Sequence, residues 1–398
     1  MKYLTEGLPG TGGVIRWTPE DFVVEELPLY EPSGEGEHTY AWVEKVGLST
    51  FRAVQMLASA LGIPPSRIGY AGMKDAQARA RQTFSLEGVP PERVLALDLP
   101  GLRVLRATRH RNKLKLGHLR GNRFQIRIRE VPREAMARCQ AVLEVLLARG
   151  MPNYFGAQRF GLRENSHLLG HLLLRRDWEG FLREFLGSPH PAESQAVQEA
   201  RRKFEEGRWE EALAAFPHAM QDERTALEAL LRSGGSPDRA CQALPKPLKR
   251  FFLSAYQSHL FNAILDCRLE ALDRLQDGDI AMKHANGACF LVQDALQEQP
   301  RADRLEISPT GPLFGYKVRL AEGEPGALER ATLAAEGLRL EDWRVGGGLA
   351  PRGDRRALRV PLEGVDVRWD DGLLLEFSLP AGSYATVLLG EVMKCPLA

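Results

Sequence analysis

The first apolar pattern along the chain predicts a short β-strand at residues 21–26, directly after Pro19. Side chains alternate along a strand, so Phe22, Val24 and Glu26 share one face. An acid on an apolar face has two explanations. Either the strand register ends at solvent there, or Glu26 is buried with a partner, for which the nearby Arg16 is a candidate.

The next pattern predicts strand, helix and strand around a tight loop. Residues 39–44 favour a strand. A helix is expected to begin after the hydroxyl cap Ser49 and to stop at Gly62. The apolar stripe expected on this helix is Phe51, Val54, Leu57 and Leu61. Strands at 68–71 and 83–86 then enclose a loop that carries Lys74 and Asp75.

Clear elements also follow farther along the chain. A helix is predicted from Pro132 to Gly150, and a second, amphipathic helix at 254–265 could present polar side chains to a cleft. The core positions expected in the first are Met136, Cys139, Leu143 and Leu146; the polar residues of the second are Gln257, Ser258 and Asn262.

The remaining segments have weaker signals. Residues 165–250 are helical in pattern and mixed in charge, without evident chemistry. Near the end, the turn Asp370–Gly372 predicts a hairpin of 366–369 with 373–378, and Ser383 is a candidate cap for a last helix. Further expectations are strands at 278–280 and 288–292, a rigid loop at 309–315 and a linker at 346–348.

Composition describes an ordinary globular protein with no global attraction to polyanions. The chain has 398 residues, which favours two domains, and its net charge is +1 from 53 basic and 52 acidic residues. Only 11 of the basic residues are lysine and 42 are arginine. Arginine favours bidentate phosphate contacts, although a GC-rich genome produces the same bias. Any case for nucleic acid must therefore be local.

Cysteine usage and the N-terminus indicate a cytoplasmic protein. The five cysteines are scattered, without a C-x-x-C pair or histidines at zinc spacing, so we expect reduced, mostly buried thiols. The first residues lack the apolar core of a signal peptide, and no segment approaches the length that spans a bilayer.

The strongest local signal is a run of basic residues. Residues 99–129 contain ten cations and no Asp or Glu. Within this run, 122–129 alternate, so that Phe124, Ile126 and Ile128 face a core while arginines face the other way. The acids that balance such a face can come from elsewhere in the fold. Because natural surfaces normally mix signs, we favour a surface for a polyanion.

Two loops carry candidate chemistry. Residues 151–161 are rich in aromatics, amides and glycines; they either stack and read a base or form a packed interdomain joint. In 69–85, Gly69 and Gly72 permit a sharp turn or a close approach, and three cations surround Asp75 in sequence: Lys74, Arg79 and Arg81. Asp75 is either an ionised functional carboxylate or an ordinary turn residue.

Several chemistries are excluded by missing motifs. The chain contains no G-x-x-x-x-G-K-[ST] loop, and it lacks the H-x-E and P-C-x-x-C pair of zinc deaminases. Its nine histidines are dispersed, and His259 suits a structural role better than a base. A single carboxylate beside a cationic, aromatic surface is what remains.

An ordered set of motifs resembles the TruD family of tRNA pseudouridine synthases. F-x-V-x-E begins at Phe22, A-G-x-K-D spans 71–75, and N-Y-F-G-x-Q-R-F-G spans 153–161. Similar to the family also are G-x-x-x-G-N-x-F from Gly117, the 254–262 helix, the 309–315 loop and the final L-P-A-G-S-Y-A-T. The resemblance runs along most of the chain.

The resemblance implies a fold and a reaction. The implied fold is α/β (α+β), a pseudouridine synthase domain with a mixed, mainly antiparallel sheet at 1–165 and 351–398, interrupted by a family-specific α/β insertion domain at 166–350. The implied reaction is isomerisation of uridine to pseudouridine in tRNA, at position 13 in the D-arm. No cofactor or metal is expected, tRNA is the expected partner, no membrane is involved, and a monomer is expected.

Site residues follow from the same resemblance. Asp75 matches the catalytic aspartate, and Arg16 matches its basic companion, for which relatives carry lysine. The residues expected to bind substrate are Phe155, which would stack on the target uracil, Asn153, Phe22 and Glu26. The residues expected to bind RNA are Arg79, Arg81, Arg109, Arg111, Lys113, Lys115, Arg123 and Arg159.

Several points stay open at this stage. Asp75 could attack C1′ or C6 or act through a glycal. Lys74 should point away from its neighbour Asp75, and it either meets RNA phosphate or packs within the fold. Gly390 stands where relatives often carry arginine, and the 165–250 stretch is longer than in short bacterial relatives. The alternatives to a synthase are an RNA-binding module without chemistry and a metal-dependent hydrolase that uses Asp75.

Overall fold

The computed structural model describes residues 2–74 and 76–396, and its contacts divide the chain into two units. The interrupted unit comprises Lys2–Met151 and the chain from Val360 onward, and the inserted unit is Pro152–Arg359. Short strands β7 (Met151–Pro152) and β12 (Arg359–Val360) lie where the chain passes between them. The divisions therefore fall before the expected boundary at 165/166 and after the one at 350/351. The expected catalytic residue, Asp75, lies outside the described residues.

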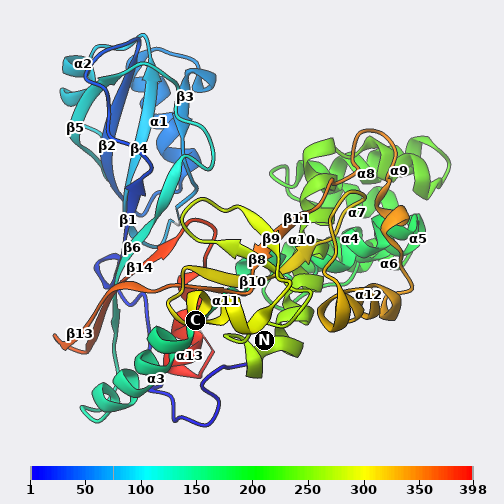
Figure 1. Cartoon of the computed structure of the whole chain (residues 1–398). Helices are drawn as coiled ribbons and strands as arrows, with labels where there is room; N and C mark the ends of the chain where they lie inside the picture. Colours follow the sequence, from blue (N-terminus) through cyan, green and yellow to red (C-terminus); the bar gives the residue numbers. More distant parts are fainter. Residues whose placement is uncertain (1, 75, 397–398) are drawn as a thin grey trace. The chain divides into compact units, whose positions relative to one another are not determined.

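An eight-stranded mixed sheet organises the interrupted unit (Figure 1), with strand order β13-β14-β6-β1-β4-β2-β5 and β3 paired to β4. Among the described strands of this sheet, only β1 and β4 pair in parallel, and the other pairings are antiparallel. The strands are β1 (Phe22–Pro28), β2 (His38–Val46), β3 (Ile68–Tyr70), β4 (Arg79–Glu87), β5 (Leu102–His110), β6 (Leu119–Ile128), β13 (Glu363–Trp369) and β14 (Leu373–Pro380). This sheet confirms the expected mixed, mainly antiparallel α/β class.

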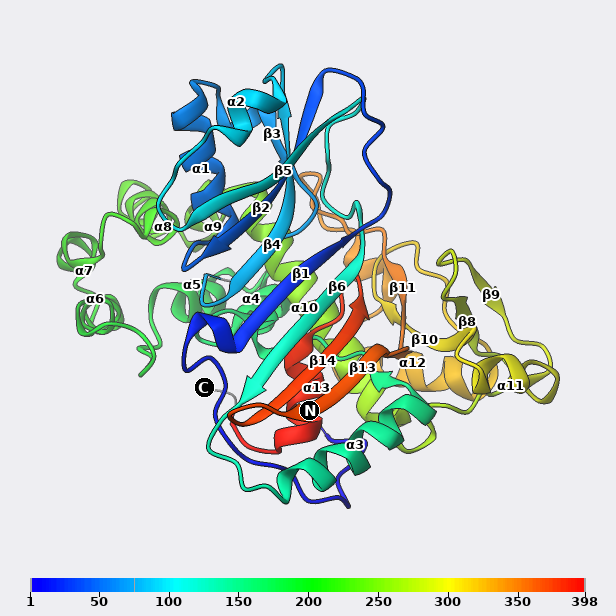
Figure 2. The ribbon, with the colours of Figure 1, turned by 90° about the vertical axis from the view of Figure 1, so that its left-hand side faces the viewer.

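Helices pack on one face of this sheet, as the alternation predicts. The buried side chains Phe22, Val24, Phe124 and Ile126 belong to one core cluster with residues of α3 (Ala135–Arg149) and α13 (Ala385–Met393). Figure 2 shows β1, β6, β14 and β13 side by side, with α13 behind them. A second cluster joins β2 and β4 to α1 (Thr50–Leu61) and the short α2 (Pro91–Leu95). The opposite face carries the arginines of β6.

Local signals in this unit are largely confirmed. The Ser49 hydroxyl accepts a hydrogen bond from the N–H of Arg52, and α1 ends at Gly62 in the left-handed region. Phe51 is 67% exposed, so its assignment to the apolar stripe is wrong. The hairpin β13–β14 forms, with positive φ at Asp371 and Gly372. The last helix has Tyr384 rather than Ser383 at its N-cap position.

The inserted unit combines a set of helices with a small sheet. Its helices are α4 (Ser166–Arg175), α5 (Trp178–Leu186), α6 (Gln195–Glu205), α7 (Trp209–Ala215), α8 (Gln221–Arg232), α9 (Pro237–Ala243), α10 (Lys246–Arg268), α11 (Ala295–Asp303) and α12 (Gly323–Ala335). Its sheet has the order β11-β10-β8-β9 and consists of β8 (Ile280–Lys283), β9 (Cys289–Leu291), β10 (Ile307–Leu313) and β11 (Asp354–Ala357).

One local prediction in the inserted unit is wrong. Residues 309–315 were expected to form a rigid loop, but most of them belong to β10. That strand pairs with β8 through Pro309 and with β11 through Pro312, so its two prolines lie inside a sheet. Proline and glycine normally indicate turns, and pairing with distant strands overrides this local signal. The helical pattern of 165–250 and the 254–265 helix are confirmed.

The described part of the chain contains no helix that is both long and apolar enough to cross a bilayer. Within the same residues, no group of three or more His, Cys, Asp or Glu side chains is placed to hold a metal ion. The five cysteines are all free thiols, as expected, but only Cys139 and Cys241 are buried, so the expectation of mostly buried thiols is wrong.

Candidate active site

A buried ion pair lies beside the loop that leads to position 75. The Nζ of Lys74 lies 3.2 Å from Oε2 of Glu26, and the two side chains are only 5% and 2% exposed. The other carboxylate oxygen of Glu26 accepts a hydrogen bond from the N–H of Thr83, at 3.2 Å. Both oxygens of this buried acid are therefore satisfied, as burial of a charge requires.

The backbone of Lys74 is held as firmly as its side chain. Its N–H donates to the hydroxyl of Thr50 at 2.8 Å, and its carbonyl accepts from Nζ of Lys45 at 3.3 Å. The Thr50 hydroxyl in turn donates to Gln82, whose amide donates to the carbonyl of Gly72. The chain is thus fixed through residue 74, immediately before the expected catalytic residue in the sequence.

Burial raises the pKa of Glu26, and the Lys74 ammonium and the N–H of Thr83 only partly offset this effect. Of the two explanations for Glu26, the buried acid with a partner is correct. The suggested partner Arg16 is wrong, since Lys74 occupies that place. The alternative in which Lys74 meets RNA phosphate is excluded by its burial.

Arg16 lies instead against an aromatic ring of the same unit. Its guanidinium carbon is 4.7 Å from the ring centroid of Phe22, within the range of a cation–π contact. Arg16 also has a positive φ of 60°, which is uncommon for a residue other than glycine. Phe22 is 4% exposed and packs in the core at 6.4 Å from Phe124, edge to face. The assigned roles of Arg16 and Phe22 stay predictions.

Gly69 has the close backbone approach that the sequence suggested. A Cβ built there would lie 2.2 Å from the carbonyl oxygen of Leu114 and 2.6 Å from the hydroxyl of Ser85. The Ser85 hydroxyl accepts from the N–H of Leu114, at 3.0 Å, so the segment after β5 is tied to β4 at this point. A residue with a Cβ at position 69 would push the segment after β5 away from β4.

A second group of candidate residues lies in the inserted unit, around Asn153. Its side-chain amide donates to the carbonyl of Ala357 at 2.9 Å, and its Oδ1 accepts from the guanidinium of Arg356 at 2.6 Å. The side chain is buried, so these contacts hold the strand and the loop together. This environment is that of a residue that positions its neighbours.

Phe155 is the partly exposed aromatic of the same loop. Its N–H donates to Oδ1 of Asn262 at 2.9 Å, and its carbonyl accepts from the same amide at 3.0 Å. The guanidinium carbon of Arg356 lies 4.1 Å from the ring centroid, and the ring of Phe261 meets it edge to face at 5.6 Å. Asn262, one of the polar residues that could face a cleft, thus holds the backbone of Phe155.

Arg159 and Arg356 differ in how readily the sequence reveals them. Arg159 lies 5.9 Å from the Phe155 ring centroid and donates to the hydroxyl of Ser258 at 3.1 Å. Arg356, which contacts both Asn153 and Phe155, was not among the expected site residues. No local motif marks it, because its partners lie about 200 positions earlier in the chain.

The basic run is balanced by acids along β6. Arg127 and Arg129 both contact the fully buried Asp21, at 3.1 and 2.8 Å, and each also pairs with an acid of the β13–β14 turn. Arg123 pairs with Glu376. The expectation of a face without acids is wrong for this strand, where the acids come from elsewhere in the fold. A role of Arg123 in RNA binding stays a prediction.

Hydrogen bonds to the arginines outweigh burial at Asp21. Burial alone would raise the pKa of this carboxyl, but hydrogen bonds from Arg129, the N–H of Thr18 and Arg127 lower it below its ordinary value. Arg79 and Arg81 are likewise paired, the first with Glu20 and Glu44 and the second with Glu25 and Glu44.

The cations of the turn between β5 and β6 have different surroundings from the arginines of β6. Lys115 is exposed, Lys113 donates to the carbonyl of Ser66, and Arg111 pairs with the exposed Glu35. Together with Tyr30, His110, Asn112 and His118, the two lysines line a shallow hollow. Lys113 and Lys115 thus place two cations beside an open hollow at this turn.

Comparison with known proteins finds the family that the sequence motifs resemble, along nearly the whole chain. The family model described as tRNA pseudouridine synthase D (TruD) matches residues 1–392. A protein of Geobacter metallireducens named tRNA pseudouridine synthase D is 52% identical over 394 residues, covering 99% of this chain and 98% of the relative. One from Thermus thermophilus, with the same name, is 42% identical over 396 residues, covering 98% and 92%.

A solved structure of a protein with the same family name is also similar to this chain. A crystal structure from Methanosarcina mazei, whose description names tRNA pseudouridine synthase D, superimposes with a TM-score of 0.82 at 30% identity. The match covers 99% of this chain and 96% of that one.

Proposed function

The chain belongs to the TruD family of tRNA pseudouridine synthases, and we propose that it isomerises uridine 13 in the D-arm of tRNA to pseudouridine without a cofactor. The observation that carries this proposal is the family match over residues 1–392, at identities of 42–52% to relatives named for this activity. The proposal treats the protein as an isomerase, an intramolecular transferase.

The reaction exchanges one bond to the ribose for another. The N1–C1′ bond breaks, the uracil reorients, and C5 bonds to C1′; the proton on C5 is lost and N1 gains one, so the product is an isomer of the substrate. A base in a helical stack must first be extruded, at a cost of roughly a few kcal/mol. Stacking on Phe155 would offset about 1–3 kcal/mol of that cost.

Asp75 is the proposed catalytic group, acting as an anion on C1′ or C6 or in glycal formation. Support comes from its place in the sequence directly after Lys74, whose N–H, carbonyl and ammonium are each held by a protein partner. A backbone fixed at one end of a short loop limits the positions that the next side chain can reach. Pre-organisation of this kind is how a scaffold aims a nucleophile.

In the inserted unit, Phe155 is the proposed stacking surface. Its backbone is held by both atoms of the Asn262 amide, and one ring face is in contact with Arg356. Asn153 acts on the substrate indirectly in this proposal, because its amide is already bonded to Ala357 and Arg356. It is a positioning residue for the loop.

A single-turnover assay on unmodified tRNA, with and without a chelator, tests this function against its rivals. The synthase releases the C5 proton of the target uridine at the same rate in both conditions and leaves the chain of the RNA intact. Cleaved RNA that appears only with added metal would instead indicate a hydrolase. Tight binding without either product would indicate an RNA-binding module.

The RNA product of the same assay identifies which uridine has been converted. Chemical mapping of pseudouridine along the product should give one site, at position 13. A single site elsewhere would keep the synthase and overturn the proposed position.

A further inference from the structure

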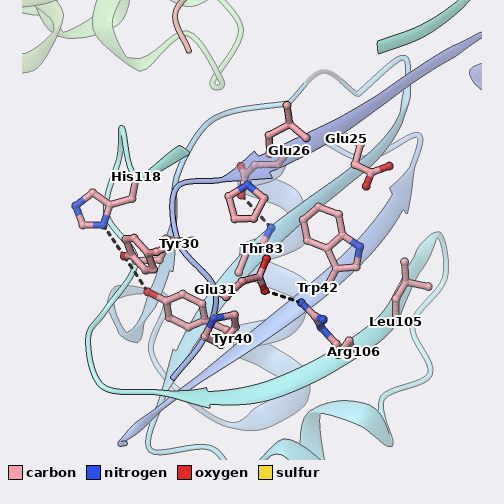
Figure 3. Close-up of a pocket in the computed structure, with 14 residues that line it drawn as sticks. Glu25, Glu26, Tyr30, Glu31, Tyr40, Trp42, Thr83, Leu105, Arg106 and His118 are labelled. Atoms are coloured by element: carbon pink, nitrogen blue, oxygen red, sulfur yellow. Dashed lines mark hydrogen bonds and ion pairs between the residues drawn. The ribbon is translucent and has the colours of Figure 1, made fainter. Parts of the chain in front are cut away.

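A cavity in the interrupted unit lies where the parallel pair β1–β4 separates (Figure 3). The pairing of these strands stops at Glu25 and Arg81, and the next acid, Glu26, binds the N–H of Thr83 through its side chain. Beyond this point a cavity of about 380 Å³ opens, within the range of roughly 300–1,000 Å³ that is typical of small-molecule sites. Its described lining includes Glu26, which was expected to bind substrate, but not Arg16, Phe22 or Phe155.

Aromatic side chains form one wall of the cavity. Tyr30 and Tyr40 bond through their hydroxyls at 3.3 Å, and Tyr30 also bonds to Nδ1 of His118 at 3.0 Å. Trp42, on the strand next to Thr83, is partly exposed and lines the same cavity. Among the described residues, no other ring or cation lies against its indole. A partly exposed indole of this kind can stack on a nucleobase.

Polar groups at the rim can read the edge of a base. Glu31 and Arg106 lie across the mouth, 3.6 Å apart, with side chains 75% and 64% exposed. An exposed pair at this distance contributes little and exchanges easily for a ligand. The carboxylate can accept two adjacent donors, such as N1–H and the amino group of guanine, and uracil has only one N–H on its pairing edge.

The cavity adjoins the basic hollow at the β5–β6 turn. Tyr30 and His118 line both, so the two spaces share a wall. The far side of the hollow carries Lys113 and Lys115, on which a phosphate can rest. A base-sized cavity with a cationic site beside it matches the two ends of a nucleotide.

We propose that this cavity and the adjoining hollow bind one unpaired guanine nucleotide of the RNA, with the base beside Trp42 and the phosphate beside Lys113 and Lys115. The proposal rests on the proposed function, since it assumes an RNA substrate. The bound nucleotide is distinct from the uridine that reacts. Holding it fixes the register of the RNA on the protein.

Titration calorimetry of the full-length protein with guanosine 5′-monophosphate, uridine 5′-monophosphate and inorganic phosphate tests the site directly. We expect the guanine nucleotide to bind most tightly and Glu31→Gln to remove its advantage over the uridine nucleotide. Equal binding of all three, or binding of phosphate alone, would overturn the assignment of a base site.

Variants extend the test to tRNA. Trp42→Ala should raise the Kd for tRNA about 5- to 150-fold, the loss typical of one base stack. Lys115→Ala should reduce the slope of log K against log salt by about 0.7, the share of one phosphate contact. Trp369→Ala, which removes an exposed indole from β13 outside the cavity, should leave the Kd unchanged.

Failures of the two proposals are distinguishable. A wild-type protein that forms pseudouridine while Trp42→Ala and Lys115→Ala bind tRNA normally would refute the nucleotide site alone. A wild-type protein that forms no pseudouridine would refute the proposed function, while calorimetry still reports on the cavity. Glu31 and Lys115 are exposed, so their replacement tests the site even if Trp42→Ala does not fold.

Discussion

Cations of the interrupted unit occur in two contrasting regions. Around β1 and β6, Lys74, Arg127 and Arg129 each contact a buried acid that another segment supplies. At the β5–β6 turn, Lys113 and Lys115 instead line an open hollow beside an aromatic cavity. A run of like charge in the sequence is therefore not a surface of like charge. We infer that the paired cations stabilise the fold and that those at the turn are available to RNA.

The largest effect is expected from Lys74→Met, which removes the ammonium and leaves Glu26 buried. Breaking a buried ion pair costs roughly 3–5 kcal/mol of unfolding free energy. Adding Glu26→Gln to this variant should restore part of the loss, because no uncompensated acid then remains. Urea denaturation of the two single variants and the double variant measures the coupling. A loss below about 1 kcal/mol for Lys74→Met would place this lysine with the exposed cations.

Asp21→Asn is expected to have the next largest effect and to change the pH dependence of stability. The lost charged hydrogen bonds correspond to roughly 1.5–3 kcal/mol at neutral pH. Because the folded pKa of Asp21 is lowered, its contribution is complete above the unfolded pKa of about 3.9 and disappears as pH falls through the folded pKa. Unfolding free energies of wild type and Asp21→Asn should thus converge in acid. A difference that stays constant below pH 4 would contradict the role of this carboxylate.

A smaller effect, on RNA affinity, is expected at the end of β5 and in the turn that follows it. Replacing Arg109, Arg111 and Lys113 together with glutamine should weaken tRNA binding and reduce the slope of log K against log salt by about 2. The matched control replaces Arg127, Arg129 and Arg368: the first two bind the buried Asp21 and the third pairs with Asp366, whereas Arg111 of the test variant pairs with the exposed Glu35. It should lower stability and leave the salt slope unchanged. An equal reduction of the salt slope in both variants would contradict the distinction between the two regions.

The sequence predicts the parts of this fold that depend on neighbouring residues. The alternation at Phe124, Ile126 and Ile128 identifies a core face, and Ser49 and Gly62 bound a helix correctly. The partner of Glu26 was missed, because Arg16 is near in sequence whereas Lys74 is 48 positions away. Strand β10 was missed because Pro309 and Pro312 resemble a turn until β8 and β11 pair with it.

The candidate site residues also divide into those that a local motif reveals and those that only the fold brings together. Asp75, Asn153 and Phe155 stand in contiguous motifs, which the sequence displays directly. Arg356, which lies 4.1 Å from the Phe155 ring centroid, comes from a segment about 200 positions later and has no motif of its own. The cavity beside Trp42 combines residues of four strands and two connections, so it exists only once the sheet has formed.

The most direct test of the synthase is Asp75→Asn, with release of tritium from C5 of uridine in tRNA as the readout and Kd for tRNA as the control. Asparagine is similar in size to aspartate but cannot act as an anionic nucleophile. We expect tritium release and pseudouridine formation to be abolished while the Kd stays close to that of the wild type. Tritium release at the wild-type rate by Asp75→Asn would contradict the assignment of this carboxylate as the catalytic group.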